Sequence, residues 1–558
     1  MPTLNRPVLY YLAIAVVQAL LLSSGLFYRQ PVLAAFTSTL ALVGGLNLQL
    51  LGHQLRQRGT WLLAGALALL MAGMSAWLYA QDVGHWLWMR WVSAAIVMTY
   101  IGTAFVLSWP TREGRRVRYR DLFQHAWNNA FIVLLALLVM LAFWLLFWLC
   151  GQLFALLGAP FARDAVGSYY FMFGALPLFF ALGMHMGRDN DKVIGLLRNV
   201  LLTVCRYLLP LCALIAVVFT LALALTGVEP IFSTGHSTSI LLCLVGSTLF
   251  LVNGVFQDGE QDAVYARPLK LLVNISLMCL PVLMLLASYS SWLRIDQYGL
   301  TPQRFLALLL VGIALVHSLA ALWAARPRQA IWLGSLRRSN PLIALLSFVL
   351  LLLVFTPVLD PMAHSAANQV ERLLSGRTPA EAFDMRTLRH RLGEPGVAQF
   401  ERLSRLVKEG QILDAPAREV LADRLLEAEP LNMSPREYGP KLEWVGPEAE
   451  GSAQLLQVSA TAIHCSGPGC VAWQVDMDGD GASEVLVVSK QAYSTSVLVY
   501  AREHGVWRDV ARLEGGAKGR KLIEQMRQGT LKLVRPRYKT LEVDGQELGV
   551  QRYTQPGK

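Results

Sequence analysis

The residues best suited to chemistry form a carboxylate-rich loop in the C-terminal part of the chain. Asp occupies three alternate positions, followed by Gly and, after two further residues, Glu: Asp476, Asp478, Asp480, Gly481 and Glu484. Calcium prefers oxygen ligands, and carboxylates at this spacing followed by a turn glycine are typical of calcium loops. An EF-hand would need a bidentate Glu where this chain has Val487. We therefore expect a calcium site of another loop type, or a hairpin turn that uses Asp-Gly chemistry without metal.

Two cysteines precede this loop. Cys465 and Cys470 are separated by Ser-Gly-Pro-Gly, whereas the other five cysteines lie in apolar segments: Cys150, Cys205, Cys212, Cys243 and Cys279. A turn of this size can close a disulfide, which requires an oxidising compartment. Free thiols are one alternative. A metal site that also uses His464 is another, although two Cys and one His leave a zinc site incomplete.

His317 is the deepest titratable group of the apolar half. An ionisable side chain at such a depth is costly and usually functional, so we consider a helix–helix hydrogen bond, a proton relay and a ligand-binding role. No Asp or Glu lies near the middle of any apolar segment, which disfavours an ion-coupled transporter. Four amides in these segments are expected to hydrogen-bond between helices: Asn47, Gln49, Asn253 and Asn274.

A second group of carboxylates follows the apolar run that ends at Phe256. Asp258, Glu260 and Asp262 alternate along this segment. One interpretation is a divalent cation held beside a phosphate-bearing lipid, because hard cations bind oxygen ligands. The other is a solvated loop.

Eleven long apolar segments must position these residues. Of the 558 residues, 54% are hydrophobic and 16% charged, which excludes a soluble globular enzyme, a disordered chain and a small disulfide-rich domain. Most segments are long enough to cross about 30 Å of hydrocarbon. The segment 128–158 is too long for one perpendicular span, so we expect a tilted helix with an interfacial end, with a kinked helix as the alternative. The segments are 8–28, 31–52, 60–80, 86–109, 128–158, 168–187, 200–226, 239–257, 270–290, 304–324 and 342–359.

The charges predict the orientation of these segments. Residues 1–359 hold 23 Lys and Arg against 11 Asp and Glu, and residues 360–558 hold 26 against 27. Cationic loops favour the cytoplasm. With the N-terminus inside, 18 cationic residues lie on the cytoplasmic side and 5 outside. We expect eleven crossings and a periplasmic C-terminal part. The basicity is then an orientation signal, and we expect lipid rather than nucleic acid as a partner.

The chain divides into four parts by composition. Residues 1–359 are the membrane bundle, 360–430 short soluble helices, 431–452 a Pro/Gly-rich linker and 453–558 a β-rich domain. The predicted fold class is an all-α polytopic membrane bundle followed by a small α+β, mainly β, extracytoplasmic domain. Strands are expected on both sides of the aspartate loop, at Val471–Val475 and Val485–Val488. The loop resembles the Asp-rich loops of FG-GAP-type β repeats. No second copy occurs, so a propeller is not predicted.

One segment before the tenth span stands out. It runs from Arg294 to Arg304 and contains Tyr298, Gly299, Leu300 and Thr301-Pro302. Gly299 can supply a turn, and Thr301 followed by Pro302 is typical of a helix N-cap with Pro at the first helical position. The Tyr-Gly-Leu-Thr-x-x-Arg core resembles the signature of a bacterial polytopic family known as domain of unknown function 4153.

The segment after the last span is similar to the same family at three places: Leu373–Arg377, Phe383-Asp384 and Leu388-Arg389. The resemblance covers roughly residues 10–405. It implies an inner-membrane protein of the bacterial envelope, and it supplies no catalytic residues.

Three functions are compatible with these features. We favour a non-enzymatic envelope platform that presents an outer domain for sensing or for binding an envelope protein partner. A transporter or flippase of a lipid-like or uncoupled substrate is the alternative. A membrane-embedded transferase is disfavoured, because such enzymes generally need an acidic residue in the first outer loop, which here is little more than Arg29-Gln30. No P-loop, Ser/His/Asp set or H-E-x-x-H motif occurs.

Overall fold

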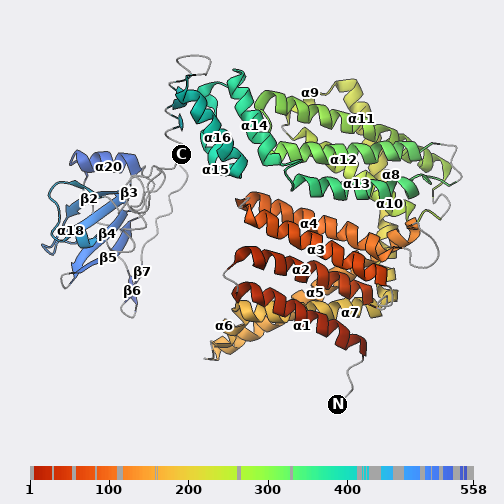
Figure 1. The fold of residues 1–558 in the computed structure, drawn as a ribbon, viewed down its shortest axis with the longest axis horizontal. Helices are drawn as coiled ribbons and strands as arrows, with labels where there is room; N and C mark the ends of the chain where they lie inside the picture. The colour runs from red at the N-terminus through yellow and green to blue at the C-terminus, as the bar shows by residue number, and fades with distance from the viewer. Residues whose placement is uncertain are drawn as a thin grey trace. The chain divides into compact units, whose positions relative to one another are not determined.

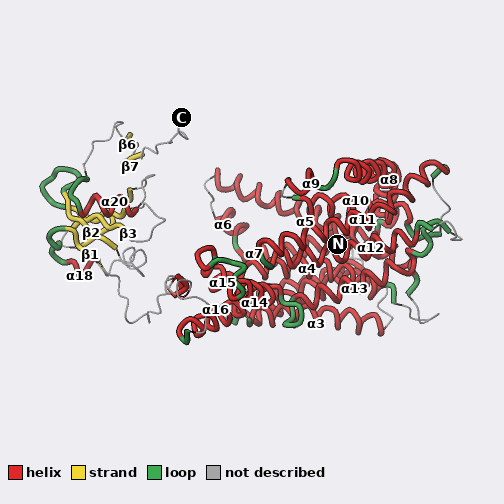
Figure 2. Tube along the Cα trace, turned by 90° about the horizontal axis from the view of Figure 1, so that it is seen from above, coloured by secondary structure: helices red, strands yellow, loops and turns green. Residues whose placement is uncertain are grey.

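The computed structural model contains two compact units, Met1–Leu425 and Leu426–Lys558. Figures 1 and 2 show the helices and strands of each unit. The structure describes residues 6–27, 30–52, 58–81, 84–109, 117–157, 159, 161–234, 236–260, 265–326, 331–410, 418, 420–422, 424–425, 442–455, 470–489, 497–503, 506–513, 519–531, 541–543 and 546–548.

The first unit is built from helices that lie side by side (Figure 1). They are α1 (Arg6–Phe27), α2 (Pro31–Leu51), α3 (Arg58–Ala80), α4 (Gly84–Leu107), α5 (Tyr119–Leu156), α6 (Phe161–Gly167), α7 (Tyr169–Asp189), α8 (Asp191–Thr226), α9 (Glu229–Ser233), α10 (Ser237–Phe256), α11 (Arg267–Tyr298), α12 (Pro302–Ala324), α13 (Leu336–Val354), α14 (Pro361–Leu374), η2 (Ala380–Ala382), α15 (Met385–Arg391) and α16 (Gly393–Lys408).

Eleven of the described helices are long and apolar enough to cross a membrane, one for each predicted segment. The membrane-bundle prediction is therefore confirmed. Three of these helices extend well beyond their predicted segments. The helix α5 has 38 residues and begins at Tyr119, α8 has 36 residues and begins at Asp191, and α11 has 32 residues and ends at Tyr298.

Small residues allow the helices to approach closely. Gly183 and Gly187 on α7 face Ala136 and Ile132 on α5, and a Cβ at Gly183 would lie 2.5 Å from Ala136 Cα. Close contact through small residues four apart is a common packing mode in membranes. Gly45 on α2 is needed for a similar reason, because the Gln18 amide occupies the space that a side chain there would fill.

The predicted helix–helix bonds are confirmed for three of the four intramembrane amides. Gln49 Nε2 on α2 donates to Gln18 Oε1 on α1 at 2.8 Å, and Asn47 Oδ1 accepts from the Thr103 hydroxyl on α4 at 3.1 Å. Asn340 Nδ2 on α13 donates to Asn253 Oδ1 on α10 at 2.6 Å. Asn274 instead accepts from Trp332, which lies in the connection before α13.

The second unit contains a five-stranded sheet in the order β1-β2-β3-β4-β5. The strand β1 is parallel to β2, and the remaining neighbours are antiparallel. A two-stranded hairpin of β6 and β7 follows α20 (Gly519–Arg527). The strands are β1 (Leu442–Val445), β2 (Cys470–Val475), β3 (Glu484–Ser489), β4 (Val497–Glu503), β5 (Val506–Leu513), β6 (Leu541–Val543) and β7 (Gln546–Leu548), with the short helix α18 (Ser452–Leu455) between β1 and β2.

Both faces of the central strand β3 are buried. Alternate residues of β3 point to opposite faces: Val485 and Val487 pack with Tyr500 on one face, whereas Leu486 and Val488 pack with Met526 of α20 on the other. The predicted strands on both sides of the aspartate loop are confirmed as β2 and β3. The strand β1 lies inside the stretch interpreted as a linker.

Candidate functional site

The Arg294–Arg304 segment joins α11 to α12 by a tight turn. Gly299 ends α11 with a positive φ of 77°, and its N–H donates to Ile295 O at 2.8 Å. Thr301 is the N-cap of α12, where its side chain accepts from the Arg304 N–H at 3.4 Å, and Pro302 follows. The local geometry predicted from Gly299, Thr301 and Pro302 is therefore confirmed.

The helix α14 docks on this turn through the backbone of Leu300. The Leu300 N–H donates to Asn368 Oδ1 at 2.8 Å, and Leu300 O accepts from Gln369 Nε2 at 2.9 Å. Two consecutive side chains of α14 thus satisfy both backbone groups of one loop residue, which would otherwise lack partners inside the protein. The motif therefore holds α14, the helix that follows the last candidate membrane span, against the helix bundle. We call this contact the Leu300 joint.

Two arginines cap the C-terminal end of α11. Arg372 on α14 is only 8% exposed, and its Nη1 and Nη2 donate to Asp296 O at 2.7 Å and Gln297 O at 3.1 Å. Arg304 Nη1 donates to Gly299 O at 2.6 Å, and its guanidinium lies 5.4 Å from the centre of the Tyr298 ring. Cations at a helix C-terminus satisfy its last carbonyls and offset the negative end of the helix dipole. Arg294 is half-buried on the same helix end.

Gly299 is required at the joint for space as well as conformation. A Cβ there would come within 2.7 Å of Gln369 Nε2 and 3.0 Å of Arg372 Cδ. A positive φ already disfavours any other residue. Sequence reasoning found Gly299 but missed its partners on α14. The signal that could have revealed them is the spacing of Asn368, Gln369 and Arg372, which places these polar groups on neighbouring positions of one helical turn.

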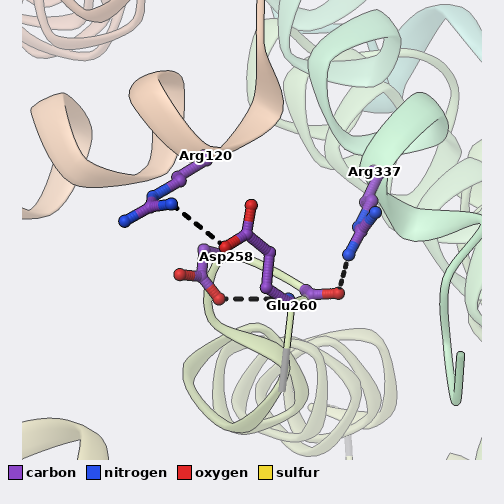
Figure 3. A network of polar contacts seen from close by, with 5 residues as sticks. Arg120, Asp258, Glu260 and Arg337 are labelled. Carbon is purple, nitrogen blue, oxygen red and sulfur yellow. Dashed lines mark hydrogen bonds and ion pairs between the residues drawn. The ribbon is translucent and has the colours of Figure 1, made fainter. Parts of the chain in front are cut away.

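A second polar network holds the loop between α10 and α11 (Figure 3). Arg120 in the first turn of α5 forms an ion pair with Glu260 at 3.1 Å, and Asp258 Oδ1 accepts from the Glu260 N–H at 3.1 Å. Arg337 of α13 donates to Gly259 O. Both described carboxylates of this predicted group therefore have protein partners. Asp262 lies outside the described residues, so a cation there stays a hypothesis.

His317 lies in α12 and contacts its own helix. Its Nδ1 lies 3.1 Å from Ile313 O, one turn earlier, and the side chain is half-buried. This contact is not the helix–helix bond that was one of the predicted roles. It is a local bond of the kind that side chains form with the preceding turn.

The aspartate loop connects β2 to β3 as a hairpin, with Val475 paired to Glu484. One oxygen each from Asp476, Asp478 and Glu484 lie within 4.8 Å of one another, a separation at which they could ligate one metal ion. Glu484 is only 6% exposed, and its Oε2 accepts from the Met477 N–H at 2.7 Å. Three carboxylates so close together repel each other unless protons or a cation offset their charge.

The backbone of the loop is arranged by the same carboxylates. Asp476 accepts from the Gly479 N–H at 2.6 Å and from the Gly481 N–H at 3.1 Å. Asp480 Oδ1 accepts from the Ala482 N–H at 2.7 Å and lies outside the three-carboxylate group. Of the four residues predicted as metal ligands, the structure thus brings three together and uses Asp480 to shape the turn.

Of the two cysteines near this loop, the structure describes Cys470. Cys470 is the fully buried first residue of β2. Cys465 lies outside the described residues, so the disulfide stays a prediction. The remaining five cysteines are free thiols in the helices.

These features define the chain as an integral multi-pass membrane protein, with a helix bundle, the docked helix α14 and a separate sheet unit. A family model described as "Domain of unknown function (DUF4153)" matches residues 32–403. The chain belongs to this family, and the resemblance seen in the Arg294–Arg304 segment is confirmed. No curated protein and no solved structure matches the chain.

Proposed function

We propose that the protein is a non-enzymatic envelope platform, in which the bundle anchors an extracytoplasmic sheet unit that binds calcium and senses a ligand or partner. The observation that supports this most is the convergence of Asp476, Asp478 and Glu484 on one hairpin. Weak calcium sites of this kind are filled in extracytoplasmic compartments, where calcium reaches millimolar levels.

The bundle side of the proposal rests on the Leu300 joint. A soluble helix fixed to the membrane bundle by Asn368, Gln369 and Arg372 would give the chain after α13 a firm attachment. The polar side chains of the motif are hydrogen-bonded to the backbone of α11 and of the turn. This arrangement favours an anchoring role for the motif over a catalytic one.

Calcium binding is tested with the full-length protein in detergent or nanodiscs. Isothermal titration with calcium should show one site, and the double substitution D476N/D478N should abolish it. The matched control D509N removes an exposed carboxylate of β5 and should leave the site intact. Titration with magnesium distinguishes a calcium site from general attraction of divalent cations. No heat from calcium in the unsubstituted protein would refute the metal part of the proposal.

The compartment is tested separately. Alkaline phosphatase is active only when exported, so a fusion after Leu425 should be active and a fusion after Phe256 should be inactive. The opposite pattern would place the sheet unit in the cytoplasm. It would remove the basis for both the calcium and the disulfide proposals.

A further inference from the structure

The helix α8 is longer than one membrane crossing requires. Its 36 residues extend about 54 Å, whereas the hydrocarbon layer is about 30 Å thick. The part from Tyr207 to Thr226 alone covers about 30 Å. The preceding turns, Asp191–Arg206, must therefore lie outside the hydrocarbon layer or along its surface. We call these turns the surface segment.

The first half of the surface segment lies at the membrane face where α5 begins. The helices α5 and α7 are antiparallel, since Gly187 faces Ile132 and Gly183 faces Ala136, one turn further along α5. The end of α7 at Asp189 and the start of α5 therefore share one face. The surface segment begins directly afterwards, and Arg198 Nη1 donates to Asn128 Oδ1 of α5 at 2.9 Å.

The second half of the segment reaches other landmarks of the same face. Cys205 packs against Gly254 near the end of α10, where a Cβ would lie 2.8 Å from its Sγ. Arg206 O accepts from the Tyr265 hydroxyl at 2.6 Å. Tyr265 belongs to the α10–α11 connection, in which Glu260 pairs with Arg120 of α5. The segment thus stays at one membrane face over its whole length.

The side chains of the surface segment form three separate faces. An α-helix turns about 100° per residue, so the buried set, the exposed apolar set and the exposed polar set each form one stripe. The buried set packs on the bundle: Ile194, Leu202 and Cys205. The exposed apolar set is Val193, Leu196, Leu197, Val200 and Val204. The exposed polar set is Lys192, Asn199, Thr203 and Arg206, and Asp191 is exposed at the N-terminal end of the segment.

The surface segment could instead project into water or cross the hydrocarbon, but neither position suits its three faces. If the segment projected into water, five large apolar side chains would be exposed in one stripe. If it crossed the hydrocarbon, the charge of Lys192 and the amide of Asn199 would be desolvated, which is costly. A position in the plane of the membrane surface satisfies both stripes.

We propose that Asp191–Arg206 is an amphipathic helix that lies in the bilayer interface and binds lipid headgroups. Its apolar stripe enters the boundary between headgroups and acyl chains, and its polar stripe faces water. Lys192 and Arg206 flank the ends of the polar stripe, so the lipids it favours are anionic ones. The segment links α7 to the α10–α11 part of the bundle along that surface.

The experiment compares two neighbouring positions in the full-length protein. Asn199→Cys and Val200→Cys variants are reconstituted in nanodiscs, with the parent protein as background for native thiols such as Cys243. Each is treated with a membrane-impermeant maleimide. Separately, each is labelled with bimane and mixed with lipids carrying a nitroxide near the headgroup or at the tail end. Leu214→Cys, further along the exposed side of α8, is the control inside the crossing.

We expect the maleimide to label position 199 and not 200. Bimane at 200 should be quenched most by the nitroxide near the headgroup, and bimane at 214 by the one at the tail end. Replacing neutral lipid with anionic lipid should strengthen the quenching at position 200. The double substitution K192Q/R206Q should abolish this dependence on lipid charge. Labelling of both positions would mean that the segment projects into water. Protection at 200 without lipid quenching would mean that protein covers the stripe. Either result overturns the proposal, as does quenching at 200 mainly from the tail end.

Discussion

The turn at the Leu300 joint connects α11 to α12, and the aspartate loop connects β2 to β3. Both contain charged residues that could do chemistry. They differ in the partners of their charged groups. At the joint, Arg304 and Arg372 donate to backbone carbonyls at the end of α11. In the loop, Asp476, Asp478 and Glu484 accept only backbone N–H groups within the described part of the chain and converge on one another.

This difference separates a structural motif from a candidate binding site. A charged group whose hydrogen-bonding capacity is used inside the protein stabilises the fold and has little left for a ligand. Charges of one sign that are held close together are unfavourable alone and become favourable when a counter-ion binds. Docking of α14 thus explains the polar residues of the Arg294–Arg304 segment, and the aspartate loop is the better candidate for ligand binding.

The largest expected effect tests the joint. Gly299→Ala should destabilise the docking of α14 by about 2 to 3 kcal/mol, because it combines strain at a positive φ with displacement of Gln369. Hydrogen exchange across Pro361–Leu374 measures this opening. Gly312→Ala is the control, since a Cβ there meets nothing within 4 Å. Equal exchange in the two variants would contradict the structural role of the motif.

The next effect tests the loop. At a calcium concentration about ten times the Kd, binding stabilises the folded sheet unit by about 1.4 kcal/mol. Asp478→Asn should remove most of this stabilisation and leave calcium-free stability nearly unchanged or slightly raised, since one repelling charge is lost. Thermal unfolding with calcium and with chelator measures both quantities. A calcium-dependent stabilisation that survives in this variant would place the site elsewhere.

A smaller effect concerns the ion pair between Arg120 and Glu260. The two side chains are 54% and 51% exposed, and exposed pairs contribute roughly 0.2 to 1 kcal/mol. Glu260→Gln should therefore change the unfolding free energy by less than about 1 kcal/mol, and less again at high salt. A loss several times larger would show that this loop, like the Leu300 joint, is a main structural contact.

The smallest expected effect is a loss of stability of the first unit at acidic pH. Burial acts to raise the pKa of Asp384, but hydrogen bonds from Thr387 and the charge of Arg391 outweigh it and lower the pKa below its ordinary value. A lowered pKa in the folded state contributes stability above the unfolded value of about 3.9, and this stability is lost as the pH falls through the folded value. Asp384→Asn should flatten the acid limb of the unfolding profile. An unchanged limb would contradict this assignment.

Local chemistry was predictable from the sequence. The turn at Gly299, the N-cap at Thr301 and the hairpin around the aspartate loop depend on residues within a few positions of each other. Tertiary contacts were not predictable in the same way. Asn368 and Gln369 meet Leu300 only because α14 folds back on the bundle, and Asp480 accepts from the Ala482 N–H while the other three carboxylates converge.

The start of α8 was also not predictable from hydropathy alone. The apolar run predicted a span from residue 200, whereas the helix begins at Asp191. An amphipathic stretch with Lys192 and Asn199 lowers the local hydropathy without ending the helix. Hydropathy therefore identifies the membrane crossing of α8. It does not detect the helical turns before the crossing, because their polar stripe lowers the mean hydropathy.

One measurement compares the joint and the loop directly. Hydrogen exchange of the full-length protein is followed with calcium and with chelator. We expect calcium to slow exchange at the Gly479 and Gly481 amides of the loop and to leave the Leu300 amide protected and unchanged. The account would be contradicted if the exchange rates of the loop amides did not change with calcium, or if that of the Leu300 amide did. Either result would show that the molecule is not divided into a structural joint and a calcium-binding loop.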